Sequence, residues 1–208
     1  MRPRFGVPWG VSTVEAHGGY LCRFEDVDVA WLQQVARVSL EEDGQTTEDV
    51  ALQVTLLGGP GLVRFAWDAP FTYGRQGARW YLSHHSLARR LSEHLKTALH
   101  VYVFDPDDLE QVMAYGNGRR VGGELLRYVD VDFDIDEDDD VAFEKLKNTW
   151  PIGHLARVLG VAREELLRLP RHSTALIDLR RFYPPQPLWK LFPESLLGGR
   201  TAARAVAS

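Results

Sequence analysis

The sequence predicts an α+β fold: an antiparallel sheet built of hairpins and packed by helices, with a small helical C-terminal part. Two observations predict the hairpins, because β-rich runs flank a Gly/Pro turn at 58–61 and an Asn-Gly turn at 117–118. A third predicts the packing. Leucine recurs at every fourth residue at positions 87, 91, 95 and 99, which lines one face of a helix. The strand-helix-strand rhythm of a parallel sheet does not occur.

The remaining elements follow from hydrophobic periodicity and from turn and capping residues. Strands are expected at 20–24, 50–57, 62–67, 100–104, 111–115 and 121–128. Helices are expected at 29–40, 86–99, 141–150, 152–159 and 163–169, and residues 70–77 are expected to form a loop. Asp26 or Asp28 is suited to cap the first of these helices, because a carboxylate at that place accepts from free backbone N–H groups.

Length and composition indicate one packed globular domain. The 208 residues are 45% hydrophobic and 25% charged, which excludes collagen-like, low-complexity and wholly disordered chains. We expect a single α+β domain over 1–181, with a helical C-terminal part at 145–181, and a Pro-rich, partly disordered tail at 182–208. No apolar run is long enough for a signal peptide or a membrane span, so we expect a cytoplasmic protein that does not contact membranes.

The sequence carries no recognisable catalytic, cofactor or metal motif. Cys22 is the only cysteine, so an intramolecular disulfide and the zinc sites that need several cysteines are excluded. The seven histidines form no His-Glu-x-x-His pattern, and neither a nucleophile elbow nor a phosphate-binding glycine loop is present. We therefore expect no catalytic residue, no cofactor and no bound metal. An enzyme that lacks these signatures remains an open third possibility.

The most unusual feature is an acidic run at 130–140, which holds eight Asp or Glu residues and no base. The formal net charge of the whole chain is −5, whereas the segment from 145 to 208 is basic. The run begins with strict alternation over 128–136. If this stretch is a strand, Val129, Val131, Phe133 and Ile135 face the core, and the aspartates line the other face.

Three interpretations of the acidic run compete. It is a solvated strand end that leads into a loop, a docking strip for a basic partner, or a divalent-metal site. The metal interpretation is disfavoured, because the run lacks the glycine and the final glutamate of a calcium-binding loop. The docking interpretation makes the following residues candidates for partner binding: Asp130, Asp132, Asp134, Asp136, Glu137 and Asp138.

A second functional hypothesis concerns residues 152–169, IGHLARVLGVAREELLRL, which resemble a helix-turn-helix. Arg163 and Arg168 would then lie on or near the recognition helix of a DNA-binding regulator. Glu164 and Glu165 lie at the end of that helix where phosphate contacts are usually made, and their charge opposes such contacts. Simple packing of two short helices on the sheet is the favoured interpretation, and nucleic acid is an unlikely partner.

The order of elements from 86 to 133 also resembles a known group of proteins. A leucine-rich helix precedes a strand that ends in Phe104-Asp105, a strand that ends in Tyr115-Gly116, and a charged strand. This order resembles bacterial immunity proteins that are encoded beside polymorphic toxins. The resemblance implies a non-enzymatic antidote that binds and occludes a toxin, and it assigns no residue. A nuclease toxin is usually basic because its substrate is a polyanion, which agrees with an acidic docking strip.

Overall fold

The computed structural model describes residues 15–23, 27–57, 61–95, 97–131, 140–167 and 174–197. Its strands are β1 (His17–Arg23), β2 (Ala51–Leu56), β3 (Leu62–Asp68), β4 (Leu99–Asp105), β5 (Leu109–Gly116), β6 (Arg119–Arg127) and β7 (Thr174–Asp178). Its α-helices are α1 (Val29–Glu42), α2 (Arg75–Ser83), α3 (Ser86–His94), α4 (Asp140–Lys147), α5 (Pro151–Leu159), α6 (Arg163–Leu167) and α7 (Glu194–Leu197). Short 3₁₀ helices are η1 (Pro70–Thr72), η2 (Tyr128–Asp130) and η3 (Leu188–Leu191).

The seven strands form one sheet in the order β6-β5-β4-β1-β3-β2-β7, and every neighbouring pair is antiparallel. The predicted α+β class and the antiparallel sheet are therefore confirmed. Both predicted hairpins are present as β2–β3 and β5–β6. The turn of the second hairpin holds Asn117 and Gly118 with positive φ angles of 50° and 72°, a conformation that favours this residue pair.

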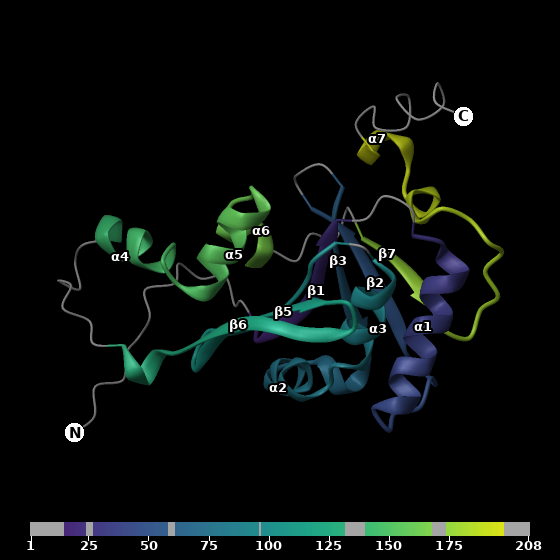
Figure 1. The fold of residues 1–208 in the computed structure, drawn as a ribbon, viewed down its shortest axis with the longest axis horizontal. Helices are drawn as coiled ribbons and strands as arrows, with labels where there is room; N and C mark the ends of the chain where they lie inside the picture. The colour runs from purple at the N-terminus through teal and green to yellow at the C-terminus, as the bar shows by residue number, and fades with distance from the viewer. Residues whose placement is uncertain are drawn as a thin grey trace.

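Helices cover both faces of the sheet, and each face has its own apolar cluster. In Figure 1, α5 and α6 lie to the left of β1 and β3, while α1 lies to the right. Alternation along β1 sends Tyr20 and Cys22 into the larger cluster, which packs against α1, α2 and α3, and sends Leu21 into the smaller one under α5 and α6. The protein is thus a three-layer structure with the sheet in the middle.

Helix α1 begins where the sequence predicts. Asp28 is its N-cap, and its carboxylate accepts a hydrogen bond from the backbone N–H of Trp31 at 2.9 Å. Leu32, Ala36 and Leu40 are fully buried at helical spacing against the sheet. Capping and periodicity therefore agree for this element.

The helix predicted at 86–99 is shorter than its leucine repeat. It ends at His94, and the backbone of Leu95 is extended. Leu87 and Leu91 are fully buried on the helix, Leu95 is half-buried, and Leu99 is buried as the first residue of β4. The repeat continues past the helix end because Leu99, on β4, packs in the same apolar cluster as Leu87 and Leu91.

The expected loop at 70–77 was wrong, because η1 and the start of α2 lie there. Gly77 allows the close packing of these two elements, since a Cβ at this position would lie 2.1 Å from the carbonyl oxygen of Thr72. Tyr81 on α2 accepts a hydrogen bond at 2.7 Å from the backbone N–H of Trp67 on β3. Helix α2 is therefore held by tertiary contacts that local sequence does not reveal.

The C-terminal segments differ from expectation in two ways. Within 145–181, the structure adds strand β7, which pairs with β2. Within the predicted tail, residues 182–197 are described and pack against the larger core cluster through Leu188, Phe192 and Leu197. Residues 198–208 lie outside the described part of the chain.

Candidate functional site

The predicted acidic docking strip is only partly within the described residues. Asp130 lies in η2 and is exposed. The five other candidates lie outside the described residues: Asp132, Asp134, Asp136, Glu137 and Asp138. The strand considered for 128–136 is not present at its first three residues, because Tyr128–Asp130 form a 3₁₀ turn and Val129 is 82% exposed instead of facing the core.

The anchoring of Tyr128 explains this turn. Its backbone N–H donates to the carbonyl of Asp108 at 2.9 Å, and its ring packs against Trp150 with centroids 5.2 Å apart. Its hydroxyl donates to the carboxylate of Glu110 at 3.2 Å. With Tyr128 fixed in this way, the next residue points to solvent and the strand ends.

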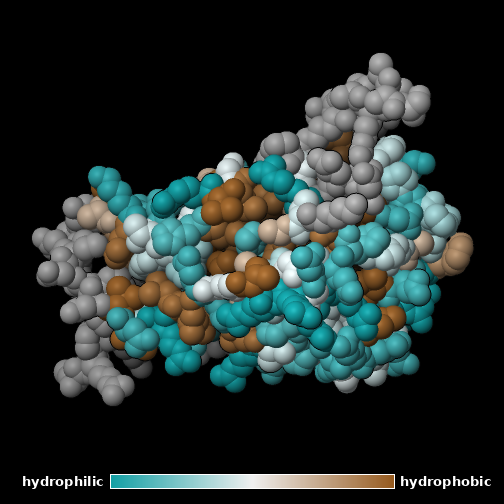
Figure 2. All heavy atoms as spheres, in the orientation of Figure 1, coloured by the Kyte–Doolittle hydropathy of each residue, from teal (hydrophilic) through white to brown (hydrophobic). Residues whose placement is uncertain are grey.

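Large apolar side chains are exposed on both sides of the acidic run. Val129 lies just before it, and Val141, which follows its last acid, is 64% exposed on α4. Val121 and Leu125 are exposed on β6, the edge strand that leads into η2. Figure 2 shows hydrophobic atoms gathered on the side of the molecule where α5 and α6 lie. Exposed apolar side chains beside charged ones are typical of a protein-binding surface.

A buried polar network holds α5 and α6 against this side of the sheet. Glu110 of β5 is fully buried and forms an ion pair with Arg163 of α6, which is also buried. Its second carboxylate oxygen accepts from the backbone N–H of Ile152 at 3.1 Å, in the first turn of α5. Burial, and then the nearby charge of Glu110, raise the pKa of Tyr128. One carboxylate therefore fixes η2, α5 and α6 together.

This network decides what the helix-turn-helix-like segment does in the structure. Arg163, the predicted DNA contact, is buried and forms an ion pair with Glu110 inside the protein. Leu155, Leu159 and Leu166 are buried against the sheet, and α6 is only five residues long. The predicted Gly turn is present, since Gly160 has a left-handed φ of 72°. Arg168 lies outside the described residues.

Sequence reasoning missed Glu110. A signal exists, because alternation along β5 places Glu110 and Val112 on the same face of the sheet, and Val112 is buried there. A charged residue at an inward position indicates a buried partner. The partner itself, 53 residues away, cannot be read from the local pattern.

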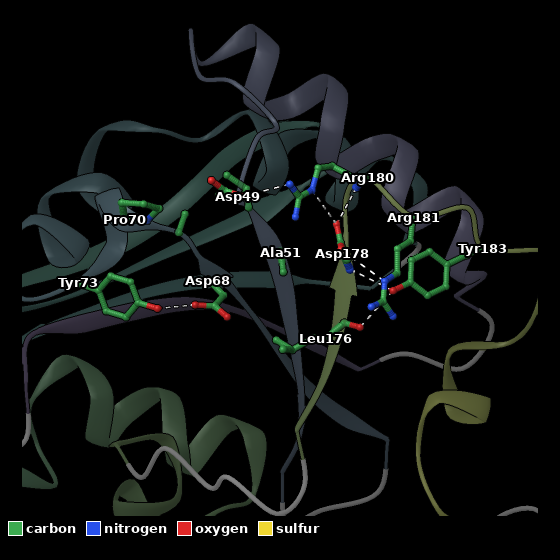
Figure 3. A pocket seen from close by; sticks show the side chains of 12 residues that line it. Asp49, Ala51, Asp68, Pro70, Tyr73, Leu176, Asp178, Arg180, Arg181 and Tyr183 are labelled. Carbon is green, nitrogen blue, oxygen red and sulfur yellow. Dashed lines mark hydrogen bonds and ion pairs between the residues drawn. The ribbon is translucent and has the colours of Figure 1, made fainter.

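A cavity of about 490 Å³ lies at the other end of the sheet, over β3, β2 and β7 (Figure 3). Its floor is Ala51 of β2, which pairs with Asp68 on one side and Asp178 on the other. Alternation places these three side chains on the face that α5 and α6 cover elsewhere. Among the described elements, η1 borders this part of the face through Pro70. The cavity is therefore an open, polar part of the sheet surface.

The charges of this cavity are unequally compensated. Arg180 bridges Asp178 and Asp49, and Arg181 pairs with Asp178. The backbone N–H of Arg180, donating at 2.8 Å, and the two guanidiniums hold the pKa of Asp178 below its ordinary value. Asp68 instead accepts the hydroxyl of Tyr73 at 2.6 Å, which raises the pKa of that tyrosine. Among the described residues, the carboxylate of Asp68 forms no ion pair.

A second cavity, of about 400 Å³, lies between α1, α3 and β5. It contains Ser86, His85 and Asp43, a set that invites comparison with a hydrolase triad. Ser86 however donates directly to the carboxylate of Asp43 at 2.5 Å. In an activated nucleophile the serine hydrogen-bonds to the histidine instead. This hydrogen bond links Ser86, the first residue of α3, to Asp43, the C-cap residue of α1.

The described residues contain no group of three or more metal-ligating side chains and no helix long and apolar enough to span a membrane. Comparison of the chain with protein-family models, curated proteins and solved structures finds no match.

Proposed function

We propose that this protein is a cytoplasmic, non-enzymatic binding protein, an immunity-type antidote that occludes a basic toxin protein through its acidic run. The partner-binding residues in this proposal are Asp130, Asp132, Asp134, Asp136, Glu137 and Asp138.

The observation that carries the proposal is the exposure of Val129 and Val141. These two side chains lie on either side, in the sequence, of the eight Asp and Glu residues of the acidic run. A solvated loop needs no apolar neighbours, whereas a protein interface combines an apolar centre with a charged rim. The carboxylates would steer a basic partner, and the valines would be buried on contact.

The test uses the protein encoded by the neighbouring gene, purified with an inactivated toxin-like domain. Its dissociation constant is measured at low and high salt against the wild type and a variant with Asp132, Asp134, Asp136 and Asp138 each changed to Asn. We expect the variant to fold normally, to associate more slowly and to show a flatter salt dependence, because exposed charge acts mainly on the association rate.

A control variant carries the same change in net charge elsewhere. It replaces four exposed glutamates with glutamine: Glu15, Glu41, Glu48 and Glu93. This control should bind much as the wild type does. Equal losses in both variants, or equal affinity of the wild type and the aspartate variant at both salts, would contradict the acidic run as the docking site. Sequence-specific binding to duplex DNA would favour the regulator instead.

A further inference from the structure

The open sheet face at β3, β2 and β7 presents a regular row of side chains that suits one kind of ligand. Sheet pairing sets Asp68, Ala51 and Asp178 in one row across three strands. Neighbouring strands are about 4.8 Å apart, so the two aspartates are separated by roughly 10 Å with only a methyl group between them. The row is a notch with a carboxylate on each side (Figure 3).

The charge of the notch calls for a cation on the Asp68 side. Asp178 has two arginine partners, while the only side-chain partner of Asp68 among the described residues is the neutral hydroxyl of Tyr73. That hydrogen bond orients one carboxylate oxygen, Oδ1, and leaves Oδ2 for a further donor. Three carboxylates and two guanidiniums line the cavity, so its formal charge is negative.

The walls of the notch suit an aliphatic stem and a planar head group. Leu176 is 52% exposed on the row next to Ala51, and Tyr73 stands beside Asp68. An arginine side chain offers apolar methylenes, a fork that matches a carboxylate, and a plane that stacks on an aromatic ring. A cavity of about 490 Å³ has room for the side chain and adjoining peptide units.

We propose that this cavity is a binding site for an arginine side chain of a peptide or protein, with the guanidinium paired to Asp68 above Ala51 and the stem against Leu176. The site is independent of the acidic run, which follows β6 at the opposite edge of the sheet. If the partner is a basic protein, as proposed above, the cavity provides a second anchor for it.

The test is a titration of the isotope-labelled full chain, followed by NMR, with an acetylated and amidated Gly-Arg-Gly peptide. A matched peptide carries citrulline, which keeps the shape of arginine without its charge. We expect the arginine peptide to shift the amide signals of Ala51, Asp68 and Leu176, and the citrulline peptide to leave them unchanged. Equal binding of the two peptides, or shifts elsewhere only, would overturn the proposal.

Two variants locate the site. Asp68→Asn should weaken binding about tenfold, because it removes the negative charge that pairs with the guanidinium. Ala51→Leu fills the notch without touching a charge and should abolish binding. Glu41→Gln, an exposed carboxylate on α1, is the control and should leave binding unchanged. Unchanged affinity in both site variants, with native spectra, would overturn the proposal.

The acidic-run variant separates this inference from the proposed function. With Asp132, Asp134, Asp136 and Asp138 changed to Asn, the arginine peptide should bind as it does to the wild type. Loss of peptide binding in that variant would place the guanidinium on the acidic run and contradict the cavity as its site.

Discussion

At the residue scale, the stability of the fold depends on the buried ion pair of Glu110 and Arg163. Both side chains are buried, so each charge depends on the other. Replacing such a pair by apolar groups is often tolerated, but removing one partner leaves an uncompensated charge in the interior. The pair therefore fixes how α6 sits on the sheet.

Arg163→Met should lower the free energy of unfolding by about 3–5 kcal/mol. Adding Glu110→Gln to that variant should restore part of the loss, because glutamine carries no charge, its oxygen can accept from the backbone N–H of Ile152, and its NH₂ can donate to the hydroxyl of Tyr128. Urea denaturation of the wild type, the single variant and the double variant measures both effects. A double variant less stable than the single one would contradict this role of the charge.

His17 makes stability depend on pH. Its ring packs edge-on against Tyr102 and Phe104, and burial lowers its pKa from 6.5 to about 4. The unfolded chain takes up this proton at a higher pH than the folded protein, so the contribution of His17 is complete above pH 6.5 and is lost as the pH falls towards 4. Over this pH range the titration of His17 should lower the free energy of unfolding by about 3 kcal/mol in total.

The prediction is checked by urea denaturation at about pH 7.5 and about pH 4.5 for the wild type and His17→Gln. The wild type should lose more stability than the variant between these two values, because glutamine takes up no proton. The carboxylates titrate in both proteins and cancel in the comparison. Parallel losses in the two proteins would mean that His17 is protonated in the folded state.

At the element scale, α3 offers a graded test of the leucine repeat. Leu91→Ala should cost about 2–5 kcal/mol, since this side chain is fully buried between α3 and the sheet. Leu95→Ala should cost clearly less, because Leu95 lies just past the helix end and is half-buried. Thermal or urea unfolding of the two variants gives the order, and equal costs would contradict the observed helix end.

The elements also show what the sequence can predict. Hairpins with strong turn residues, such as Asn117-Gly118, and a capped helix such as α1 are set locally and were predicted correctly. The end of α3, the whole of α2 and strand β7 depend on distant partners. Tyr81 bonds to β3, and β7 pairs with a strand more than a hundred residues earlier. Local periodicity carries no information about such contacts.

The candidate sites follow the same division. The acidic run is visible in the sequence because it is continuous, and it remains a prediction over the residues that the structure does not describe. The cavity was not predicted, because Asp68, Ala51 and Asp178 become neighbours only through the register of three strands. Each of them is unremarkable in its own segment.

At the scale of the whole molecule, the C-terminal segment is part of the core. Val29 donates its backbone N–H to Gln186, and Leu188 donates to Val27, so this segment is bonded to the start of α1. Its buried side chains are Leu188, Phe192 and Leu197. The hydroxyl of Tyr183 accepts the backbone N–H of Asp178 on the outer strand β7.

Truncation after Arg181 should therefore destabilise the protein strongly. Each fully buried large apolar side chain contributes about 1.5–3 kcal/mol, while small domains have a net stability of about 5–15 kcal/mol. The melting temperature of the truncated chain should fall by many degrees, whereas removal of residues 198–208 serves as the milder comparison. An unchanged melting temperature after the longer truncation would contradict the packing described for this segment.

Stability should not depend on a bound metal ion. No metal-ligating group of three or more side chains occurs in the described residues, and the acidic run lacks the pattern of a calcium loop. Thermal melts with and without a chelator should coincide. A fall of several degrees in the chelator would revive the metal interpretation of the run.

The position of Cys22 allows thiol labelling to measure how often the centre of the sheet opens. Cys22 carries the only thiol in the sequence, it lies on β1, the fourth strand in the order of the sheet, and β1 is hydrogen-bonded to β3 and β4 on its two sides. Burial raises the pKa of its thiol to about 12, so the reactive thiolate is almost absent in the closed state. A thiol reagent reaches it only when the centre of the sheet opens. Under conditions where reclosing is faster than labelling, the labelling rate divided by that of a free thiol gives the equilibrium constant for opening, in native buffer and without denaturant.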